Sequence, residues 1–335
     1  MAAAQLPPVR WGLLGTASIA ASAFLPGLAA AGGVPYAVAG RDPARTRSWA
    51  HEHGVLSAVD DMASLLADPA VEAVYVPLPN AVHADWTVAA LQAGKAVLCE
   101  KPLAGSVAET ARVLAAARAT GGLLWEAFVF PFSPQTALVQ RLLGNGEIGD
   151  LRTIHGEFHF RLTDEADIRF DAGLDGGALN DVGCYPLRLA RLLLGADPVA
   201  ASATQYARFG GVDTQTAGCL TFPDERQLVF SCGFDRPYSA FTRVIGTDGE
   251  LRLDNAYHPS AQSSCELWRD GQRVETHPGP PLPSFAYALR HVHKVLRGDA
   301  EPRHLALAEA LPNARALELV RSAAVSCPDR TAPAR

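Results

Sequence analysis

The chain has 335 residues, more than one hydrophobic core usually supports, so we expect two domains. Hydrophobic residues make up 48% and charged residues 19% of the chain, a balance that excludes an intrinsically disordered protein. The formal net charge is −6, and the 29 Lys and Arg residues form no run. The sequence therefore shows neither the basic patch of a nucleic-acid-binding protein nor an attraction to acidic membrane surfaces.

The six cysteines occur singly, without a C-x-x-C pair or a close histidine partner. At this chain length such spacing predicts reduced, mostly buried thiols rather than disulfides. They are Cys99, Cys184, Cys219, Cys232, Cys265 and Cys327.

The first nine residues lack the basic segment and apolar core of a signal peptide. Residues 11–40 carry no charged side chain and are long enough to cross a bilayer, but glycines and prolines interrupt them repeatedly. We therefore expect a cytoplasmic protein in which this stretch forms a strand, a helix and a second strand.

The first 125 residues alternate strand and helix patterns. Apolar runs predict strands at residues 9–14, 36–39, 74–76 and 96–99, and helices are predicted at residues 17–31, 43–53, 81–94 and 107–119. Asp42 is an expected N-cap followed by a proline, and Ser106 and Glu109 match a capping box. This alternation predicts an α/β fold with a parallel sheet, a Rossmann domain over residues 1–124.

After residue 125 the pattern becomes that of an antiparallel sheet. Between residues 154 and 162 apolar side chains alternate with polar ones. Further strands are predicted at residues 219–222, 228–234, 242–245 and 266–268, and two closing helices at residues 285–296 and 305–324. We expect a second, α+β domain over residues 125–335, built on a large, mostly antiparallel sheet with one open face.

A dinucleotide-binding turn is predicted where the first strand meets the first helix, at Gly15, Thr16, Ala17, Ser18 and Ile19. Small residues let the backbone approach a pyrophosphate, and the helix N-terminus favours the anion. Any tight strand-to-helix turn would share this spacing, since alanines replace two of the usual glycines. The complete strand-helix-strand unit around the turn favours the cofactor interpretation.

The end of the second predicted strand indicates which cofactor is bound. Gly40 stands where an NAD-specific site usually has a carboxylate, and Arg41 follows it. An arginine suits the 2′-phosphate of NADP(H), and Arg45 offers a second contact, whereas Asp42 is expected to cap its own helix. The alternative is a solvated arginine at a helix start.

Three further motifs resemble those of the glucose–fructose oxidoreductase/inositol dehydrogenase (Gfo/Idh/MocA) family. They are residues 76–83 (VPLPNAVH), residues 100–102 (EKP) and residues 176–185 (GGALNDVGCY). The resemblance covers essentially the whole chain. Within the family, residues 167–170 and 185–188 are similar to the NDP-hexose 3-ketoreductases of deoxysugar biosynthesis.

The resemblance implies NADPH-dependent reduction of the C3 ketone of a nucleotide-linked keto-deoxyhexose, with TDP as the expected nucleotide. It also implies a cis Lys101-Pro102 peptide, and a homodimer or homotetramer formed through the open sheet face. The cofactor contacts expected from these motifs are Pro77, Leu78, Asn80, His83, Glu100, Lys101 and Pro102.

Reduction of a ketone requires a proton donor and a group that stabilises the developing alkoxide. Lys101 follows a strand at the edge where open parallel sheets bind their ligands, although a surface lysine is the alternative. Glu100 points to the opposite side of the strand, which favours a structural or ribose-binding role. His83 is either a substrate contact or a packed helix residue.

Tyr185 and Asp181 are four residues apart, so on a helix both side chains project from one face. Tyr185 is a candidate proton donor beside Lys101, or else a packed core tyrosine. Arg169 is a candidate for binding substrate hydroxyls or a pyrophosphate, or else a surface arginine. We predict Lys101, Tyr185 and Asp181 as the catalytic residues.

No metal site is expected. His155, Glu157 and His159 alternate on one predicted strand, but three side chains in a row on a strand converge poorly on one ion. Two other functions are weighed: an NADP-dependent dehydrogenase of a free sugar, polyol or dihydrodiol, and a non-catalytic NADP-binding regulator. The predicted catalytic residues argue against a regulator, since a sensor needs no proton donor.

Overall fold

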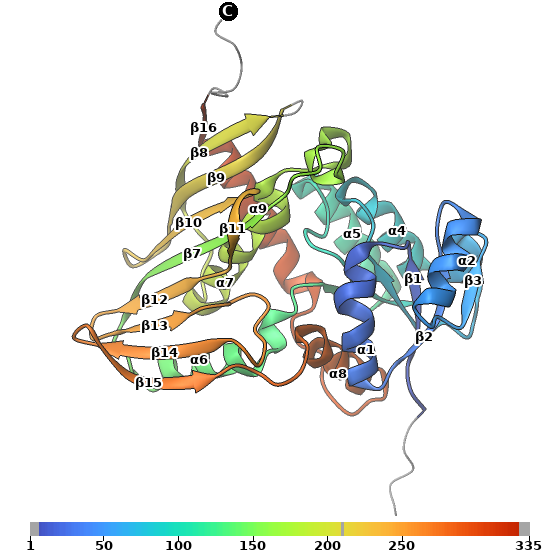
Figure 1. Cartoon of the computed structure of the whole chain (residues 1–335), viewed down its shortest axis with the longest axis horizontal. Helices are drawn as coiled ribbons and strands as arrows, with labels where there is room; N and C mark the ends of the chain where they lie inside the picture. Colours follow the sequence, from blue (N-terminus) through green and yellow to red (C-terminus); the bar gives the residue numbers. More distant parts are fainter. Residues whose placement is uncertain (1–6, 209–210, 328–335) are drawn as a thin grey trace, which may run out of the picture.

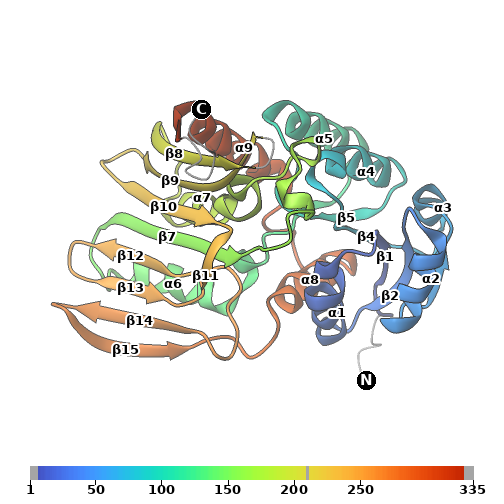
Figure 2. The same ribbon diagram turned by 45° about the horizontal axis from the view of Figure 1, so that its top comes forward.

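The computed structural model describes residues 7–208 and 211–327, which form two β-sheets side by side with helices between and around them (Figures 1 and 2). Residues 1–6, on which the signal-peptide expectation partly rests, lie outside the described part of the chain. Across the described ranges, no helix has both the length and the apolar character needed to cross a membrane. All six cysteines are free, and four of them are buried, as expected.

The first sheet has six parallel strands in the order β3-β2-β1-β4-β5-β6. They are β1 Arg10–Leu14, β2 Val34–Ala39, β3 Ser57–Val59, β4 Ala73–Val76, β5 Ala96–Cys99 and β6 Leu124–Glu126. The connecting helices are α1 Leu25–Ala31, α2 Pro43–Glu52, α3 Met62–Ala67, α4 Asn80–Gln92 and α5 Val107–Thr120. This confirms the Rossmann domain, and its strand order reverses between β1 and β4, where such sheets bind ligands.

Local sequence explains where these helices begin. The Asp42 carboxylate accepts hydrogen bonds from the backbone N–H groups of Ala44 and Arg45, at 2.9 and 3.1 Å, as expected for an N-cap. The Ser106 hydroxyl accepts one from the N–H of Glu109 at 3.1 Å. Only this half of the expected capping box forms, because the Glu109 carboxylate pairs with Arg112.

The second sheet has ten strands and is mostly antiparallel, which confirms the predicted fold class. Its order is β15-β14-β13-β12-β7-β10-β9-β8-β16, with β11 paired to β7. The strands are β7 Leu151–Arg161, β8 Ala200–Arg208, β9 Val212–Thr221, β10 Gln227–Gly233, β11 Asp235–Ser239, β12 Thr242–Gly246, β13 Glu250–Leu253, β14 Ser264–Arg269, β15 Gln272–Pro278 and β16 Ala324–Cys327. Only the β7–β10 and β8–β16 pairs are parallel.

One face of this sheet is covered by helices, and the other is open. Apolar side chains of α6 (Pro134–Gly144), α7 (Cys184–Leu194) and α9 (Ala306–Ala323) pack with the inward side chains of the strands in one core. Ile154 and Phe158 of β7 belong to this core, as their alternation predicted. The strand therefore presents His155 and Glu157 to the opposite face.

The domain boundary expected between residues 124 and 125 stays a prediction, and two segments make contacts across it. Strand β6 extends the first sheet to Glu126. Helix α8 (Ser284–Leu296) packs Phe285 and Leu289 against the core of the first sheet, beside α1 in Figure 1. The last helices thus return to the Rossmann part and fix the two sheets relative to each other.

Candidate active site

A cavity of about 260 Å³ lies between the two sheets, at the carboxyl ends of the strands where the first sheet reverses its order. Its lining includes, from the first part of the chain, residues 17–19, 77–80, His83, Glu100 and Lys101 and, from the second, Phe158, Phe160, Arg169, Asp181, Tyr185 and His258. The fold therefore brings the predicted catalytic residues together at the predicted edge.

The turn after β1 has the geometry of a dinucleotide site. Gly15 has φ +108°, a conformation that side chains rarely adopt, and a Cβ there would lie 3.0 Å from Leu78 Cδ2. Its N–H donates to Ala39 O at 2.7 Å, which holds the turn against the end of β2. The backbone can therefore approach a bound pyrophosphate, and the residues present fit a dinucleotide cofactor.

Beyond the end of β2, Arg41 and Arg45 are exposed. The Asp42 carboxylate is bound to the N-terminus of α2, so it is engaged with its own helix. The side chain that stays available at the expected ribose position is therefore Arg41, and its contact with a 2′-phosphate stays a prediction.

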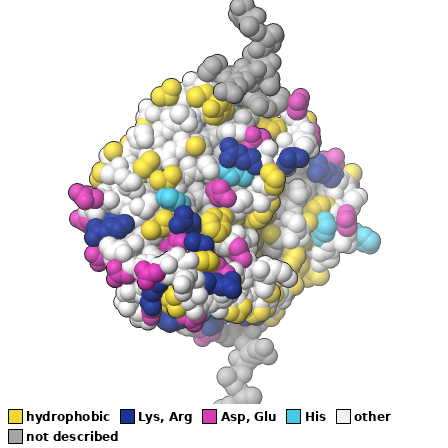
Figure 3. All heavy atoms as spheres, turned by 60° about the vertical axis from the view of Figure 1, so that its left-hand side comes forward, with side chains coloured by type: hydrophobic (Ala, Val, Ile, Leu, Met, Phe, Trp, Pro, Cys, Tyr) yellow, Lys and Arg dark blue, Asp and Glu magenta, His cyan; other side chains and the backbone are white. Residues whose placement is uncertain are grey.

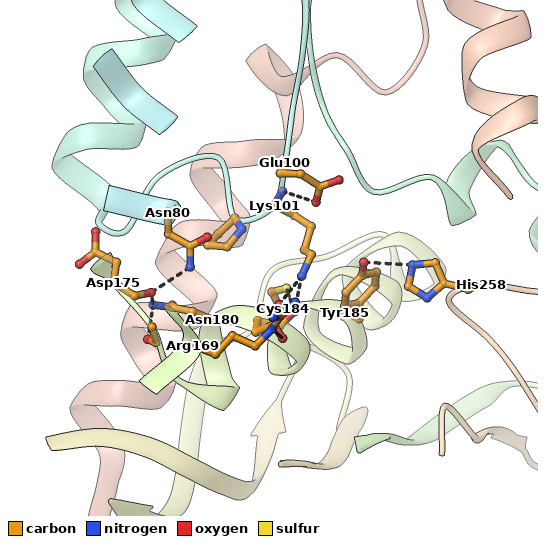
Figure 4. A network of polar contacts seen from close by, with 12 residues as sticks. Asn80, Glu100, Lys101, Arg169, Asp175, Asn180, Cys184, Tyr185 and His258 are labelled. Carbon is orange, nitrogen blue, oxygen red and sulfur yellow. Dashed lines mark hydrogen bonds and ion pairs between the residues drawn. The ribbon is translucent and has the colours of Figure 1, made fainter. Parts of the chain in front are cut away.

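Lys101 follows β5 and its peptide bond to Pro102 is cis, as the motif implied. Its Nζ donates to the backbone oxygen of Asp181 at 2.6 Å and to Asp181 Oδ1 at 2.9 Å (Figure 4). An ammonium group has three N–H bonds, so one is left for the cavity that the side chain lines. Burial opposes the charge, but the Asp181 carboxylate outweighs it and raises the pKa of Lys101 above its usual range.

Asp181 is held between two cations. Its Oδ2 accepts from Arg169 Nε at 2.7 Å, and Lys101 binds its other oxygen. Burial alone would raise the pKa of Asp181, but Lys101 and Arg169 outweigh burial and lower it to about 2. Arg169 also forms an ion pair with Asp167 at 3.2 Å, so the alternative of an unpaired surface arginine does not hold. Asp181 is therefore a carboxylate that fixes Lys101.

Tyr185 lies in the first turn of α7, after a π-helical turn over Leu179–Gly183. Pro186 falls in the same turn, where a missing N–H costs little, so the helix continues through it. The Lys101 Nζ lies 5.0 Å from the centre of the Tyr185 ring. Burial raises the pKa of Tyr185 well above its usual value, so the phenol stays protonated.

Two predicted cofactor residues, Glu100 and Asn80, form hydrogen bonds within the protein. Glu100 accepts from the Tyr75 hydroxyl at 2.6 Å and from the N–H of Lys101 at 3.2 Å. The Asn80 amide donates to the carbonyl of Asp175 at 2.8 Å, across the cleft. Asp175 has φ 55°, in the left-handed region that glycine adopts most easily. These contacts join the two parts of the chain beside the cavity.

His83 is fully buried, with Nδ1 2.9 Å from Pro102 O and Nε2 2.7 Å from Leu78 O. Its ring therefore links the segment after β4 to the turn after Lys101. This geometry favours the packed helix residue among the two interpretations, although the ring also lines the cavity. Pro77 and Leu78 line the cavity as well, and their cofactor contacts stay predictions.

Sequence reasoning missed His258, which follows β13. Its Nε2 lies 3.2 Å from the Tyr185 hydroxyl oxygen, and its ring lines the cavity (Figure 4). Burial, followed by the charge of Lys101, lowers the pKa of His258 to about 4. No local motif surrounds this histidine, so only the packing of residues 73 positions apart identifies it.

The alternating residues of β7 have separate surroundings. His155 is exposed, Glu157 accepts a hydrogen bond from the Ser239 hydroxyl, and His159 is buried with Nε2 2.9 Å from Ser231 Oγ. Over residues 7–208 and 211–327, no three His, Cys, Asp or Glu side chains are grouped as a metal ion would need.

Comparison with known proteins adds independent information. Residues 9–128 match the oxidoreductase family with an NAD-binding Rossmann fold, and residues 136–252 match the GFO/IDH/MocA C-terminal domain. D-xylose 1-dehydrogenase (NADP(+)) 2 of Haloferax volcanii is 38% identical over 88% of this chain and 91% of its own length.

Two reductases are similar as well. The dTDP-3,4-didehydro-2,6-dideoxy-α-D-glucose 3-reductase of Streptomyces violaceoruber is 42% identical over 76% of this chain and 75% of its own length. The crystal structure of KijD10, a 3-ketoreductase from Actinomadura kijaniata in complex with NADP and TDP-benzene, superposes with a TM-score of 0.88 at 31% identity, covering 96% of this chain and 99% of that one. The chain is an enzyme that belongs to the Gfo/Idh/MocA family of oxidoreductases.

Proposed function

We propose that this enzyme uses NADPH to reduce the C3 ketone of a nucleotide-linked keto-deoxyhexose, with TDP as the nucleotide. The observation that carries the proposal is the pairing of a fixed ammonium group with a protonated phenol in one cavity at the cofactor edge of the sheet. These are the two groups that reduction of a ketone needs from the protein.

The side chains divide the chemistry between them. When bound, the nicotinamide cofactor supplies the hydride. The free N–H of Lys101 binds the carbonyl oxygen of the substrate and stabilises the charge that develops on it. The phenol of Tyr185 donates its proton to this oxygen. Asp181 accepts no substrate proton, because its carboxylate is held by Lys101 and Arg169.

The preference for NADPH rests on Arg41. It stands exposed after Gly40, and the neighbouring Asp42 carboxylate is bound to its own helix, so no free carboxylate opposes a 2′-phosphate there. An arginine binds phosphate through two or more charge-assisted hydrogen bonds. The preference for NADPH is supported by two relatives: KijD10 was crystallised with NADP, and the xylose dehydrogenase is an NADP(+) enzyme.

The relatives support two different classes of substrate. The similarity to the dTDP-sugar 3-reductase and to KijD10 favours a nucleotide-linked ketone. The similarity to D-xylose 1-dehydrogenase extends over 88% of this chain, against 76% for the dTDP-sugar 3-reductase, and it favours oxidation of a free sugar with NADP⁺ as the second candidate. In the oxidation direction the proton step runs in reverse, so the phenolate form of Tyr185 would receive the proton of the substrate hydroxyl.

A spectrophotometric assay separates the two candidates. NADPH absorbance is followed with purified enzyme and a TDP-linked 3-keto-deoxysugar produced in place by an upstream dehydratase, beside a panel of free sugars, polyols and dihydrodiols with NADP⁺. We expect rapid NADPH oxidation with the nucleotide sugar. Turnover confined to the panel would overturn the substrate assignment and leave a dehydrogenase.

We also propose that the enzyme is a homodimer or homotetramer assembled through the open face of the second sheet. That face is hollowed by a cavity of about 750 Å³ lined by residues of β7, β8, β9, β10 and β12. Figure 3 views the side that carries this sheet and shows acidic, basic and hydrophobic side chains interspersed. Light scattering of the purified protein tests this, and a monomer at micromolar concentration would contradict it.

A further inference from the structure

His258 is placed to act on the proton donor of the reaction. It lies between β13 and β14, outside the three motifs that carry the other site residues. Its Nε2 is 3.2 Å from the Tyr185 oxygen, and the two ring centres are 5.2 Å apart at 66°. Its backbone N–H donates to Asn255 Oδ1 at 2.9 Å, and Phe158 packs against its ring, so the imidazole has a fixed position.

The imidazole is neutral in this place, because burial and the nearby Lys101 ammonium both oppose a positive charge on it. A neutral imidazole carries one proton, on Nδ1 or on Nε2. Within the described chain its Nδ1 has no hydrogen-bond partner, and the residue is only partly buried, so this nitrogen is free to accept from a water molecule. The Nε2 nitrogen faces only the phenol oxygen.

The two tautomers have opposite effects on Tyr185. If the imidazole proton is on Nδ1, Nε2 accepts a hydrogen bond from the phenol, whose proton then points at the histidine and away from the substrate. If Nε2 carries the proton, it donates to the phenol oxygen, and the phenol O–H turns into the cavity. Only the second arrangement also stabilises the negative charge that the oxygen acquires as its proton leaves.

We propose that His258 is a positioning residue that donates its Nε2–H to the Tyr185 oxygen, directs the phenol proton to the substrate and stabilises the resulting phenolate. In this step the phenol O–H bond breaks and an O–H bond forms on the reduced carbon's oxygen, while His258 keeps its own proton. The inference rests on the proposed role of Tyr185 as proton donor. It does not depend on which sugar is the substrate.

The other polar groups at the site cannot replace this contact. The Lys101 ammonium lies over the ring of Tyr185, and two of its N–H bonds are engaged by Asp181. Arg169 binds the carboxylates of Asp181 and Asp167. In the part of the chain that the structure describes, the Tyr185 hydroxyl has one hydrogen-bond partner, His258.

A double-mutant cycle tests the inference. Steady-state rates are measured for wild type, His258→Leu, Tyr185→Phe and the double variant, with whichever substrate the wild-type enzyme turns over. We expect His258→Leu to lower kcat about 100-fold, the loss typical of one donor to a developing oxyanion, with KM and the Kd of NADPH changed less than about threefold. In the Tyr185→Phe background the same change should cost almost nothing further.

Two further variants separate this role from damage to the fold. His258→Gln keeps an amide donor and should recover most of the lost rate, whereas His51→Leu, an exposed histidine of α2, should match wild type. A readout independent of turnover is the ionisation of Tyr185 at alkaline pH, from the tyrosinate absorbance of each protein minus that of its Tyr185→Phe counterpart. Tyr185 should ionise at lower pH in wild type than in His258→Leu.

Additive losses in the cycle, or equal ionisation of Tyr185 with and without His258, would overturn the inference. Failure of the proposed function looks different. If the proposed function is wrong, the wild-type enzyme turns over free sugars alone, while the rate losses of the His258 and Tyr185 variants are still non-additive.

Discussion

The Asp181 carboxylate keeps Lys101 protonated, and the dependence of the Lys101 charge on this carboxylate can be measured. In Asp181→Asn the negative charge 2.9 Å from Nζ is removed while burial and the neighbouring Arg169 stay. With an effective dielectric constant of ~20, two charges at this distance attract by about 6 kcal/mol. One pH unit corresponds to about 1.4 kcal/mol, so the loss is large enough to bring the titration of Lys101 into the range of an ordinary assay.

The assay is the pH dependence of kcat/KM for ketone reduction between about pH 6 and pH 10. In wild type the pKa of Lys101 lies above its usual range, so the ammonium form persists and no alkaline decline from Lys101 is expected. In Asp181→Asn the rate should fall tenfold per pH unit above a new, lower midpoint, because the neutral amine no longer stabilises the alkoxide.

Asp167→Asn is the matched control. Asp167 pairs with Arg169 at 3.2 Å and has no contact with Lys101, so its removal should leave the profile unchanged. Circular dichroism and NADPH binding check that both variants fold, since breaking a buried ion pair costs about 3 to 5 kcal/mol. A folded Asp181→Asn enzyme with the wild-type profile would refute the reasoning.

Four further outcomes are expected. Lys101→Met should lower kcat about 10²- to 10³-fold in the NADPH assay, and a near wild-type rate would remove Lys101 from the mechanism. Arg41→Asp should reduce the preference for NADPH over NADH about 10- to 100-fold in kcat/KM, while Arg47→Asp should not. Tyr75→Phe should destabilise the fold by about 1 to 3 kcal/mol in urea, because the partly buried Glu100 loses its 2.6 Å hydrogen bond. The pKa of Asp181 is lowered to about 2, so its ion pairs stabilise the fold above about pH 4 and are lost as the pH falls towards 2; urea unfolding of Asp181→Asn should lack this acid dependence.

Several strongly patterned elements could be predicted from the sequence, whereas others were missed, among them the helices α6 and α7 and the strand β8. The helices predicted at residues 107–119 and 285–296 lie within two residues of α5 and α8. Strands β3 and β6 have three residues each, too few to show a period of two, and both were missed. Pairing with a neighbouring strand, rather than local preference, makes these segments extended.

The packing of α8 on the first sheet and the contact of His258 with Tyr185 could not be predicted, for a related reason. That α8 packs on α1 depends on contacts between Phe285 and Phe24, which lie at opposite ends of the chain. His258 has no motif around it, and its significance comes from Tyr185, 73 residues earlier. Such contacts cannot be predicted from local sequence, since they form only when the two sheets come together in the folded protein.

The sequence by itself determined the alternation that builds a parallel sheet, the small residues of the turn after β1 and the place of Lys101 at the carboxyl edge. These follow from the period of the side chains, the freedom of glycine and the geometry of parallel strands, all of which act over a few residues. Only the tertiary structure decided that Lys101 is an ammonium ion and Tyr185 a neutral phenol. Their protonation depends on burial and on Asp181, 80 residues from Lys101, because charges inside a protein respond to distance in space rather than along the chain.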